Sequence, residues 1–200
     1  MRTTKSRPYR MQRRAEQVEE TRRHITEAAV RLHTTVGPAR TSIASVAEEA
    51  GVTRLTVYRH FADLDELFVA CRAHWMAQLP PPDASRWPAI GDLETRVHDA
   101  LTELYGWYRE RATELYPIYR DATSTPTSSQ QARAAENRQF GDALVAGFVE
   151  AGGGRRSLQA VARHLCDFGT WRSLAVGQGL EDREIVEIGV RLITALIAPR

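Results

Sequence analysis

Apolar positions recur every three or four residues along most of this chain, which is the spacing of α-helices that bury one face. No stretch contains several strands with period-two alternation, so the pattern predicts an all-α fold. The first helix is predicted from about residue 15 to the break at Gly37-Pro38. Its apolar stripe consists of Ile25, Ala28, Ala29, Leu32 and Val36.

Two short helices and a longer one are predicted after this first helix. The short ones cover residues 43–50 and about 53–61, and Gly51 interrupts the pattern between them. Asp63 is a candidate N-cap for the longer helix, with Glu66 three residues on as its reciprocal partner.

Three consecutive prolines at residues 80–82 cannot continue a helix and mark a boundary. Beyond them a long helix begins near Leu93 and is predicted to kink or break around Tyr116-Pro117. Three more helices are predicted over about 129–150, 157–178 and 181–197. We therefore divide the chain into a basic, flexible arm (1–14), a first helical domain (15–79) and a second helical domain (80–200).

Charge is distributed unevenly, although the formal net charge of the chain is only +2. Residues 1–60 contain 12 Lys and Arg against 6 Asp and Glu, whereas residues 61–200 contain 15 against 19. This asymmetry indicates an anionic partner at the N-terminal end, while a solvated basic tail is the simpler alternative. The basic residues of the arm are Arg2, Lys5, Arg7, Arg10, Arg13 and Arg14.

The two short helices and their glycine turn have the layout of a helix-turn-helix, in which the second helix enters the major groove of DNA. Ala47 is small enough for the helices to approach closely, and Gly51 can adopt the positive φ of a sharp turn. Val52 and Val57 can pack inward and fix the crossing of the helices. The remaining residues of the second helix are then divided between groove, phosphate and core.

The stretch from about Ile25 to Trp75 resembles the N-terminal domain of the tetracycline-repressor (TetR) family of bacterial transcription regulators. The residues that carry the resemblance are Ala28-Ala29, Gly37, Ile43, Val46-Ala47, Ala50-Gly51-Val52, Thr56-Val57-Tyr58, His60-Phe61 and Glu66-Leu67. The resemblance implies a DNA-binding head, a divergent helical body and a dimer. It also identifies one departure, since the family usually has a phosphate-contacting lysine where this chain has Leu64.

DNA contacts are expected from the recognition helix, from the start of the preceding helix and from the arm. Arg54 can span the edge of a guanine or bind a phosphate, and Leu55 can meet a thymine methyl group or pack in the core. The resemblance implies phosphate contacts for Tyr58 and His60, with a buried ring as the alternative for Tyr58. The predicted set is Thr41, Ser42, Thr53, Arg54, Leu55, Thr56, Tyr58, Arg59 and His60, whose hydroxyl residues can also cap helices.

A single recognition helix reads few bases, so a homodimer on a palindromic operator is expected. The helix at 181–197 has two apolar sets, one of which can face its own core and the other a partner. The alternative is one fully buried helix in a monomer. The predicted interface consists of Ala162, Cys166, Gly169, Ser173, Val186, Val190, Ile193 and Ile197.

The second domain is rich in aromatic residues, which can line a pocket for a small apolar or aromatic effector or can form a plain core. The candidates for the effector site are Trp75, Tyr105, Trp107, Tyr108, Tyr119, Phe140, Phe168 and Trp171.

No catalytic or metal-binding motif is recognisable, and no cofactor is expected. No apolar run approaches the length of a membrane helix, no signal peptide is evident, and two cysteines suit a reducing cytoplasm. We therefore expect a dimeric DNA-binding regulator, and specifically a repressor that an effector releases from DNA. The alternatives are a constitutive DNA-binding protein without an effector, and an all-α scaffold or enzyme with a fortuitous helix-turn-helix.

Overall fold

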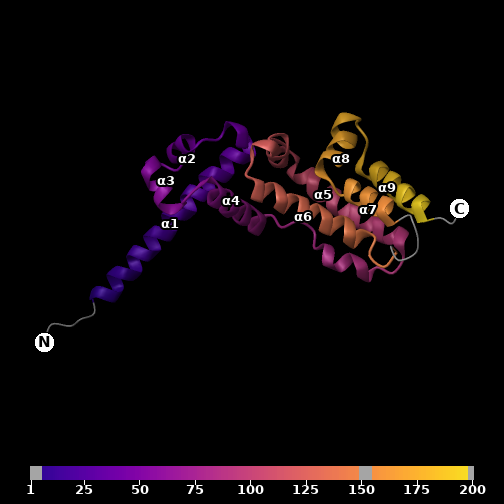
Figure 1. Cartoon of the computed structure of the whole chain (residues 1–200), viewed down its shortest axis with the longest axis horizontal. Helices are drawn as coiled ribbons and strands as arrows, with labels where there is room; N and C mark the ends of the chain where they lie inside the picture. The colour runs from indigo at the N-terminus through magenta and orange to yellow at the C-terminus, as the bar shows by residue number, and fades with distance from the viewer. Residues whose placement is uncertain (1–5, 149–154, 198–200) are drawn as a thin grey trace.

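The computed structural model describes residues 6–148 and 155–197, and this part of the chain consists of helices and their connections, without strands (Figure 1). The predicted all-α fold is therefore confirmed. The α-helices are α1 (Ser6–Thr35), α2 (Ile43–Glu49), α3 (Arg54–His60), α4 (Leu64–Gln78), α5 (Leu93–Arg120), α6 (Thr127–Leu144), α7 (Arg155–Leu165), α8 (Phe168–Arg172) and α9 (Asp182–Ile197). Short 3₁₀ segments cover Pro38–Arg40 (η1), Ala84–Ala89 (η2) and Ala122–Ser124 (η3), and a π-helical turn covers Ser173–Gly177 (η4).

Helices α1 to α4 form a head with its own small core. The Ser42 and Ser45 side chains make a reciprocal capping box at the start of α2, and Gly51 turns the chain toward α3 with a φ of 65°. Asp63 caps α4 by accepting the backbone N–H of Glu66. The core that these turns bring together consists of Ile25, Ala29, Val46, Ala47, Val57, Phe61, Leu67 and Cys71.

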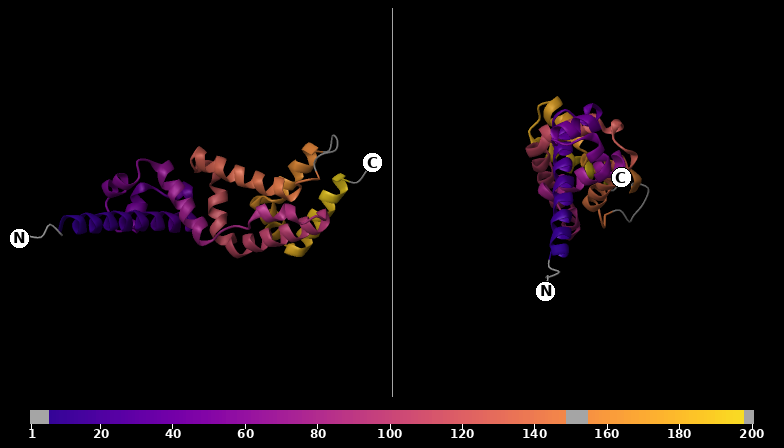
Figure 2. Two further views of the ribbon diagram at one scale, coloured as in Figure 1. Left: turned by 90° about the horizontal axis from the view of Figure 1, so that it is seen from below. Right: turned by 90° about the vertical axis from the view of Figure 1, so that its left-hand side faces the viewer.

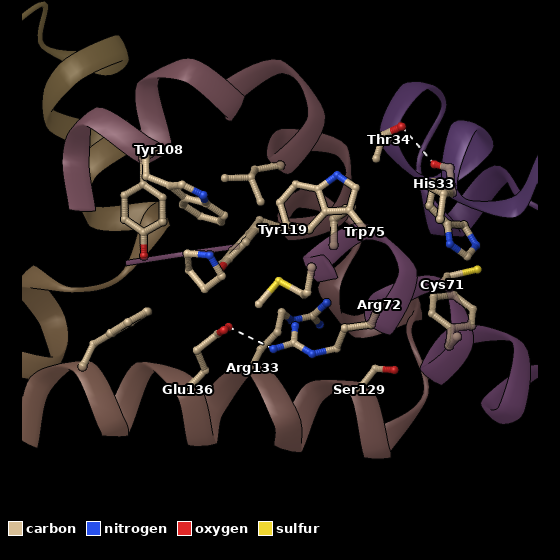
Figure 3. Close-up of a pocket in the computed structure, with 18 residues that line it drawn as sticks. His33, Thr34, Cys71, Arg72, Trp75, Tyr108, Tyr119, Ser129, Arg133 and Glu136 are labelled. Atoms are coloured by element: carbon tan, nitrogen blue, oxygen red, sulfur yellow. Dashed lines mark hydrogen bonds and ion pairs between the residues drawn. The ribbon is translucent and has the colours of Figure 1, made fainter. Parts of the chain in front are cut away.

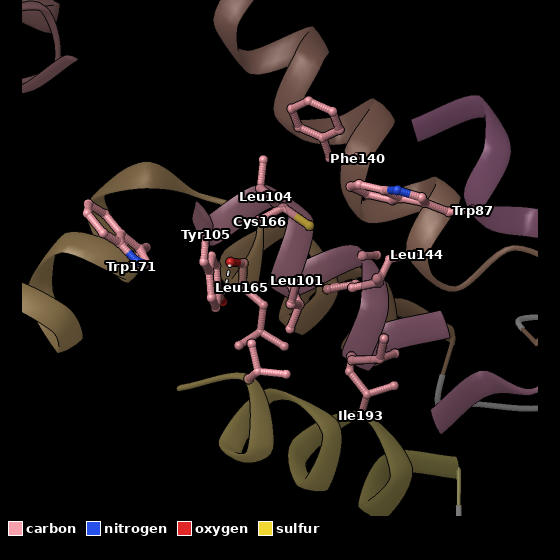
Figure 4. Close-up of a cluster of buried hydrophobic side chains, with 14 of the residues drawn as sticks. Trp87, Leu101, Leu104, Tyr105, Phe140, Leu144, Leu165, Cys166, Trp171 and Ile193 are labelled. Carbon is pink, nitrogen blue, oxygen red and sulfur yellow. Dashed lines mark hydrogen bonds between the residues drawn. The ribbon is translucent and has the colours of Figure 1, made fainter. Parts of the chain in front are cut away.

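Helices α5 to α9 form a body around the 28-residue helix α5 (Figure 4). The long helices α5 and α9 pack closely, because buried Gly189 leaves room for the side chain of Leu101. In the left view of Figure 2 the head and the body lie at opposite ends of an elongated molecule. The first half of α1 projects beyond the head (Figure 1).

Three sequence predictions differ from the structure. Helix α1 begins at Ser6, although residues 1–14 were expected to be an aperiodic arm. Residues 9–20 are all exposed, so they form a helix without an apolar stripe, and Arg, Glu and Gln are residues that favour helices. The expected break at Tyr116-Pro117 is absent because Pro117 lies in the last turn of α5, where its missing N–H interrupts only one bond.

The helix predicted over residues 157–178 is in fact three consecutive segments. Helix α7 ends at Leu165, and Asp167 starts α8 by accepting the backbone N–H groups of Gly169 and Thr170. The π-helical turn η4 then follows. The polar cap at Asp167 explains the interruption, since its side chain replaces the helical partners of those N–H groups.

Candidate DNA-binding face and central cavity

The recognition helix α3 is held to the head by one side and presents the other side to solvent. Val57 is completely buried in the core of the head, whereas Leu55 is 70% exposed and Tyr58 is 56% exposed. Arg54 and Arg59 are also exposed and lie near them on the same side of the helix. The exposure of Leu55 and Tyr58 contradicts the alternative roles of these two residues as core side chains.

The predicted hydroxyl residues all take part in local hydrogen bonds. The Oγ1 atom of Thr53 accepts the backbone N–H of Thr56 at 3.1 Å and lies 2.9 Å from the hydroxyl oxygen of Thr56. The hydroxyl group of Thr41 donates to the Gly37 carbonyl at 2.9 Å, and Ser42 caps α2. Capping is therefore present at these positions, and it is compatible with a phosphate contact.

A polar network that the sequence did not reveal fixes the end of α3 against α1. The guanidinium group of Arg22 donates to the carbonyl of His60 and to Glu66 Oε1, the latter at 2.9 Å, and its carbon lies 4.1 Å from the centroid of the Phe61 ring. Glu66 also accepts the N–H of Ala62, and these contacts lower the pKa of the Glu66 carboxyl group. Glu66 was expected to close a capping box with Asp63, but its partner is Ala62, one residue earlier.

The start of α4 is acidic and lacks the basic residue that the family resemblance leads one to expect. Leu64 is 50% exposed there, between the acidic residues Asp63 and Asp65. Of the predicted arm, Arg10, Arg13 and Arg14 are exposed on the projecting part of α1. Arg2 and Lys5 lie outside the described residues, and Arg7 lies in the first turn of α1.

A cavity of about 100 Å³ lies where α1 and α4 of the head meet α5 and α6 of the body (Figure 3). Five of the predicted effector residues line it: Trp75, Trp107, Tyr108, Tyr119 and Phe140. The other three do not line it, and they lie in the tightly packed core of the body. There the Tyr105 hydroxyl donates to the Leu165 carbonyl, Phe168 packs against the ring of Tyr119, and the Trp171 indole N–H donates to Asp182.

The cavity also has polar and charged walls that the aromatic pattern did not predict. Arg72 of α4 pairs with Glu136 of α6 at 3.0 Å, and Arg133 lies one turn before Glu136. His33 of α1 is 6% exposed and stacks on Phe68 with ring centroids 4.4 Å apart. Burial lowers the pKa of His33 to about 4, so this side chain is neutral at pH 7.

The predicted dimer interface is mostly buried inside the chain itself. Ala162 and Cys166 are fully buried, and three of the four residues chosen on α9 are also buried, namely Val186, Val190 and Ile193. Gly169 and Ser173 are exposed, but they lie on α8 and η4 beyond the end of α7. The large apolar residues that α9 leaves exposed are Leu192 (47%), Leu196 (39%) and Ile197 (37%), whereas Ile185 is completely buried.

The described residues contain no helix that is long and apolar enough to cross a membrane. Within the same residues, no group of three His, Cys, Asp or Glu side chains is placed to share a metal ion.

Comparison with known proteins places the head in a family. Residues 25–71 match the family described as bacterial regulatory proteins, tetR family. The HTH-type transcriptional regulator AcrR of Shigella flexneri is 44% identical over 53 residues, which cover 26% of this chain and 25% of that protein. The HTH-type transcriptional regulator TtgR of Pseudomonas putida is 47% identical over 60 residues, 30% of this chain and 29% of that protein. The matches thus span less than a third of either relative, and these relatives are regulators rather than enzymes.

Two solved structures have the same fold over nearly the whole chain. A tetR-family transcriptional regulator from Streptomyces coelicolor has a TM-score of 0.60 and 21% identity, over 89% of this chain and 80% of its own. NalD, the secondary repressor of the MexAB-OprM multidrug efflux pump in Pseudomonas aeruginosa, has a TM-score of 0.59 and 21% identity, over 90% of this chain and 96% of its own. At this level of identity the similarity establishes the fold of the body and nothing about its ligand.

Proposed function

The N-terminal domain of this chain belongs to the tetR family of bacterial regulatory proteins, and on that premise we propose that the chain is a DNA-binding transcription regulator that acts as a repressor in the cytoplasm. It binds a palindromic operator as a homodimer, and a small-molecule effector releases it from the DNA.

The observation that carries the proposal is the exposed side of α3. A helix that exposes Leu55 and Tyr58 beside two arginines, while Val57 anchors it, has the surface that major-groove reading requires. Large apolar side chains exposed on a short helix serve no purpose in the packing of the head. Arg54 is assigned to base reading, and Tyr58 and His60 to phosphate, as the resemblance implies.

Dimerisation through the exposed side of α9 supplies the second recognition helix. Leu192, Leu196 and Ile197 leave an apolar surface near the end of the body, far from α3 (Figure 1). A twofold axis through this surface that runs roughly along the length of the chain would place both heads on the same side of the dimer, as two half-sites require.

The position of the cavity supports control by an effector. Its walls come from α1 and α4, which also carry the head, and from α5 and α6 of the body. A molecule that binds there more tightly in one head orientation than in another shifts the population toward that orientation. The small volume of the cavity, about 100 Å³, is the observation that favours the second candidate, a constitutive regulator without an effector.

Selection of genomic fragments with the purified protein tests the DNA-binding function, because it shows directly whether a palindrome is enriched. On the selected fragment, Arg54→Ala should weaken binding by roughly 5- to 150-fold, the value of one bidentate base contact. Tyr58→Phe, which removes only a hydroxyl group, should weaken it by about tenfold.

The matched control is Arg138→Ala, which removes an exposed arginine from α6 in the body and should leave DNA binding unchanged. All variants are compared at one salt concentration, because phosphate contacts make affinity depend on salt. If Arg54→Ala and Tyr58→Phe both bind like the parent protein, the assignment of α3 as the recognition helix is wrong.

A further inference from the structure

Arg133 is a cation without a matching anion in the wall of the cavity. Its guanidinium group donates to the Thr125 hydroxyl at 2.9 Å and to the carbonyl of Ala122 at 3.4 Å, and both partners are neutral. In residues 6–148 and 155–197, no carboxylate lies within ion-pair distance of it. Burial, together with the nearby charge of Arg72, lowers the pKa of Arg133, which is the signature of an uncompensated positive charge.

The other charged groups of the cavity do not neutralise the positive charge of Arg133. Arg72 is neutralised by Glu136 at 3.0 Å, and His33 is neutral at pH 7 because burial keeps its pKa near 4. The wall therefore carries two arginines against one carboxylate, a net charge of +1. A partly buried charge is costly unless it is paired, so the cavity is electrostatically incomplete as it stands.

We propose that this cavity binds a small planar aromatic molecule that carries one carboxylate, with Arg133 as the partner of the carboxylate and the surrounding aromatic side chains as the partners of the ring. The inference rests on the proposed function, in which an effector occupies the chain. The guanidinium fork matches a carboxylate in shape as well as in charge. Trp75 and Tyr119 (Figure 3) supply flat apolar walls for the ring, and Trp107 also lines the cavity.

Size and access limit the ligand to about one ring. A cavity of about 150 Å³ in a protein core accommodates benzene, and the cavity here measures about 100 Å³. The flexible side chain of Met76 lines it and can move to admit a ring. Pro81 and Trp107 line both this cavity and an open surface groove next to η2 and α5, so the route from solvent passes between them.

Trp107 offers a second binding group to such a ligand. Its indole N–H is buried and has no hydrogen-bond partner within the described part of the chain. An oxygen of an entering carboxylate or of a ring substituent would satisfy this donor, and leaving it unsatisfied has a cost.

Calorimetric titration of the full chain without DNA tests the proposal with three one-ring probes of similar size and different charge: benzoate, benzamide and benzylammonium. We expect benzoate to bind at least ten times more tightly than neutral benzamide, and benzylammonium to give no detectable heat. Benzamide binding as tightly as benzoate, or no probe binding at all, would overturn the proposal.

Three variants locate the benzoate site. Arg133→Gln should lower benzoate affinity by at least about tenfold, whereas Arg138→Gln on the exposed side of the same helix should leave it unchanged. Glu136→Gln should raise the affinity several-fold, because it removes from the cavity wall a negative charge that repels an entering carboxylate. Misfolding cannot explain a higher benzoate affinity in Glu136→Gln together with a lower one in Arg133→Gln. If both variants bind benzoate like the parent protein, the ligand does not bind in this cavity.

Failure of this inference and failure of the proposed function have different signatures. If the protein binds its selected DNA fragment but no aromatic carboxylate, the cavity assignment is wrong and the DNA-binding function stands. If benzoate binds through Arg133 but the DNA fragment is neither bound nor released, the ligand site stands and the regulatory function is wrong.

Discussion

His33 should make the stability of the protein depend on pH. Its imidazole ring lies against Phe68 in the wall of the cavity, and burial lowers its pKa from 6.5 to about 4. Above pH 6.5 the ring is neutral in both the folded and the unfolded chain. Between pH 6.5 and 4 the unfolded chain binds a proton that the folded chain does not, so the free energy of unfolding falls as the pH falls.

The size of this effect follows from the shift in pKa. A difference of one pKa unit corresponds to about 1.4 kcal/mol, so the full shift would lower the free energy of unfolding by roughly 3 kcal/mol below pH 4. At pH 5, about one and a half pH units below the pKa of the unfolded chain, the free energy of unfolding should be lower by about 2 kcal/mol.

The measurement is urea unfolding of the parent protein and of His33→Leu at pH 7, 6, 5.5 and 5, at one protein concentration. Leucine has a similar volume and no charge, so the difference between the two proteins isolates His33 from the carboxylates that also titrate. The difference should move by about 2 kcal/mol in favour of the variant between pH 7 and 5.

Thr34→Val is the control, since Thr34 lines the same cavity and has no titratable group, so its stability difference from the parent protein should be the same at every pH from 7 to 5. A constant difference between His33→Leu and the parent protein across this range would refute the reasoning. His33 would then be protonated in the folded state at pH 5.

Three further predictions concern the joint, the DNA face and the dimer. Gly37→Ala should destabilise the protein by roughly 1–3 kcal/mol in urea unfolding, because φ is 95° there and a Cβ would collide with the Asp121 carboxylate. Leu64→Lys should tighten binding to the selected DNA and steepen its logarithmic salt dependence by about 1, as one added phosphate contact does; an unchanged slope would place Leu64 away from the DNA. Leu192→Asp should shift sedimentation toward monomer, while Val18→Asp, a similarly exposed change on α1, should not.

The head could be predicted closely from the sequence because its signals are local. A capping residue starts each of α2, α3 and α4 within a few residues of an apolar stripe, and a turn glycine separates α2 from α3. The projecting start of α1 was not predicted, because an apolar stripe identifies only a helix that packs against other parts of the protein, and residues 9–20 are all exposed. The Arg22 network was missed for a related reason, since Arg22 and Glu66 are 44 positions apart in the sequence.

In the body, the spacing of apolar residues predicts the helices but not which of their sides face the core. Helix α9 has apolar residues on two sides, and the sequence does not say which side faces α5. The structure decides through Gly189, whose missing side chain admits Leu101 and so turns Ile185, Val186 and Ile193 inward. The cavity was predicted only in its aromatic half, because the partners Arg72 and Glu136 come from different helices and neither belongs to a motif.

The joint between head and body explains how a small cavity could influence a distant recognition helix. Asp121 at the end of α5 accepts the backbone N–H of Ala39 at 3.1 Å, and Arg120 donates to the Val36 carbonyl at 2.8 Å. Arg120 pairs with Asp121 at 2.7 Å and lowers the pKa of the Asp121 carboxyl group to about 2, so the joint stays charged over the usual range of pH.

These bonds hold the segment that leads directly from α1 into α2, while the cavity lies between α1, α4 and the body. A ligand that widens the cavity must therefore move α1 or α4 against a fixed connection. In the regulatory mechanism that we propose, such a movement would rotate the head about the joint rather than separate it from the body, and in a dimer this would change the distance between the two α3 helices. The coupling can be no larger than the difference in ligand affinity between the two head orientations. A ligand that merely filled the existing space around Arg133, without moving either helix, would bind and would leave DNA affinity unchanged.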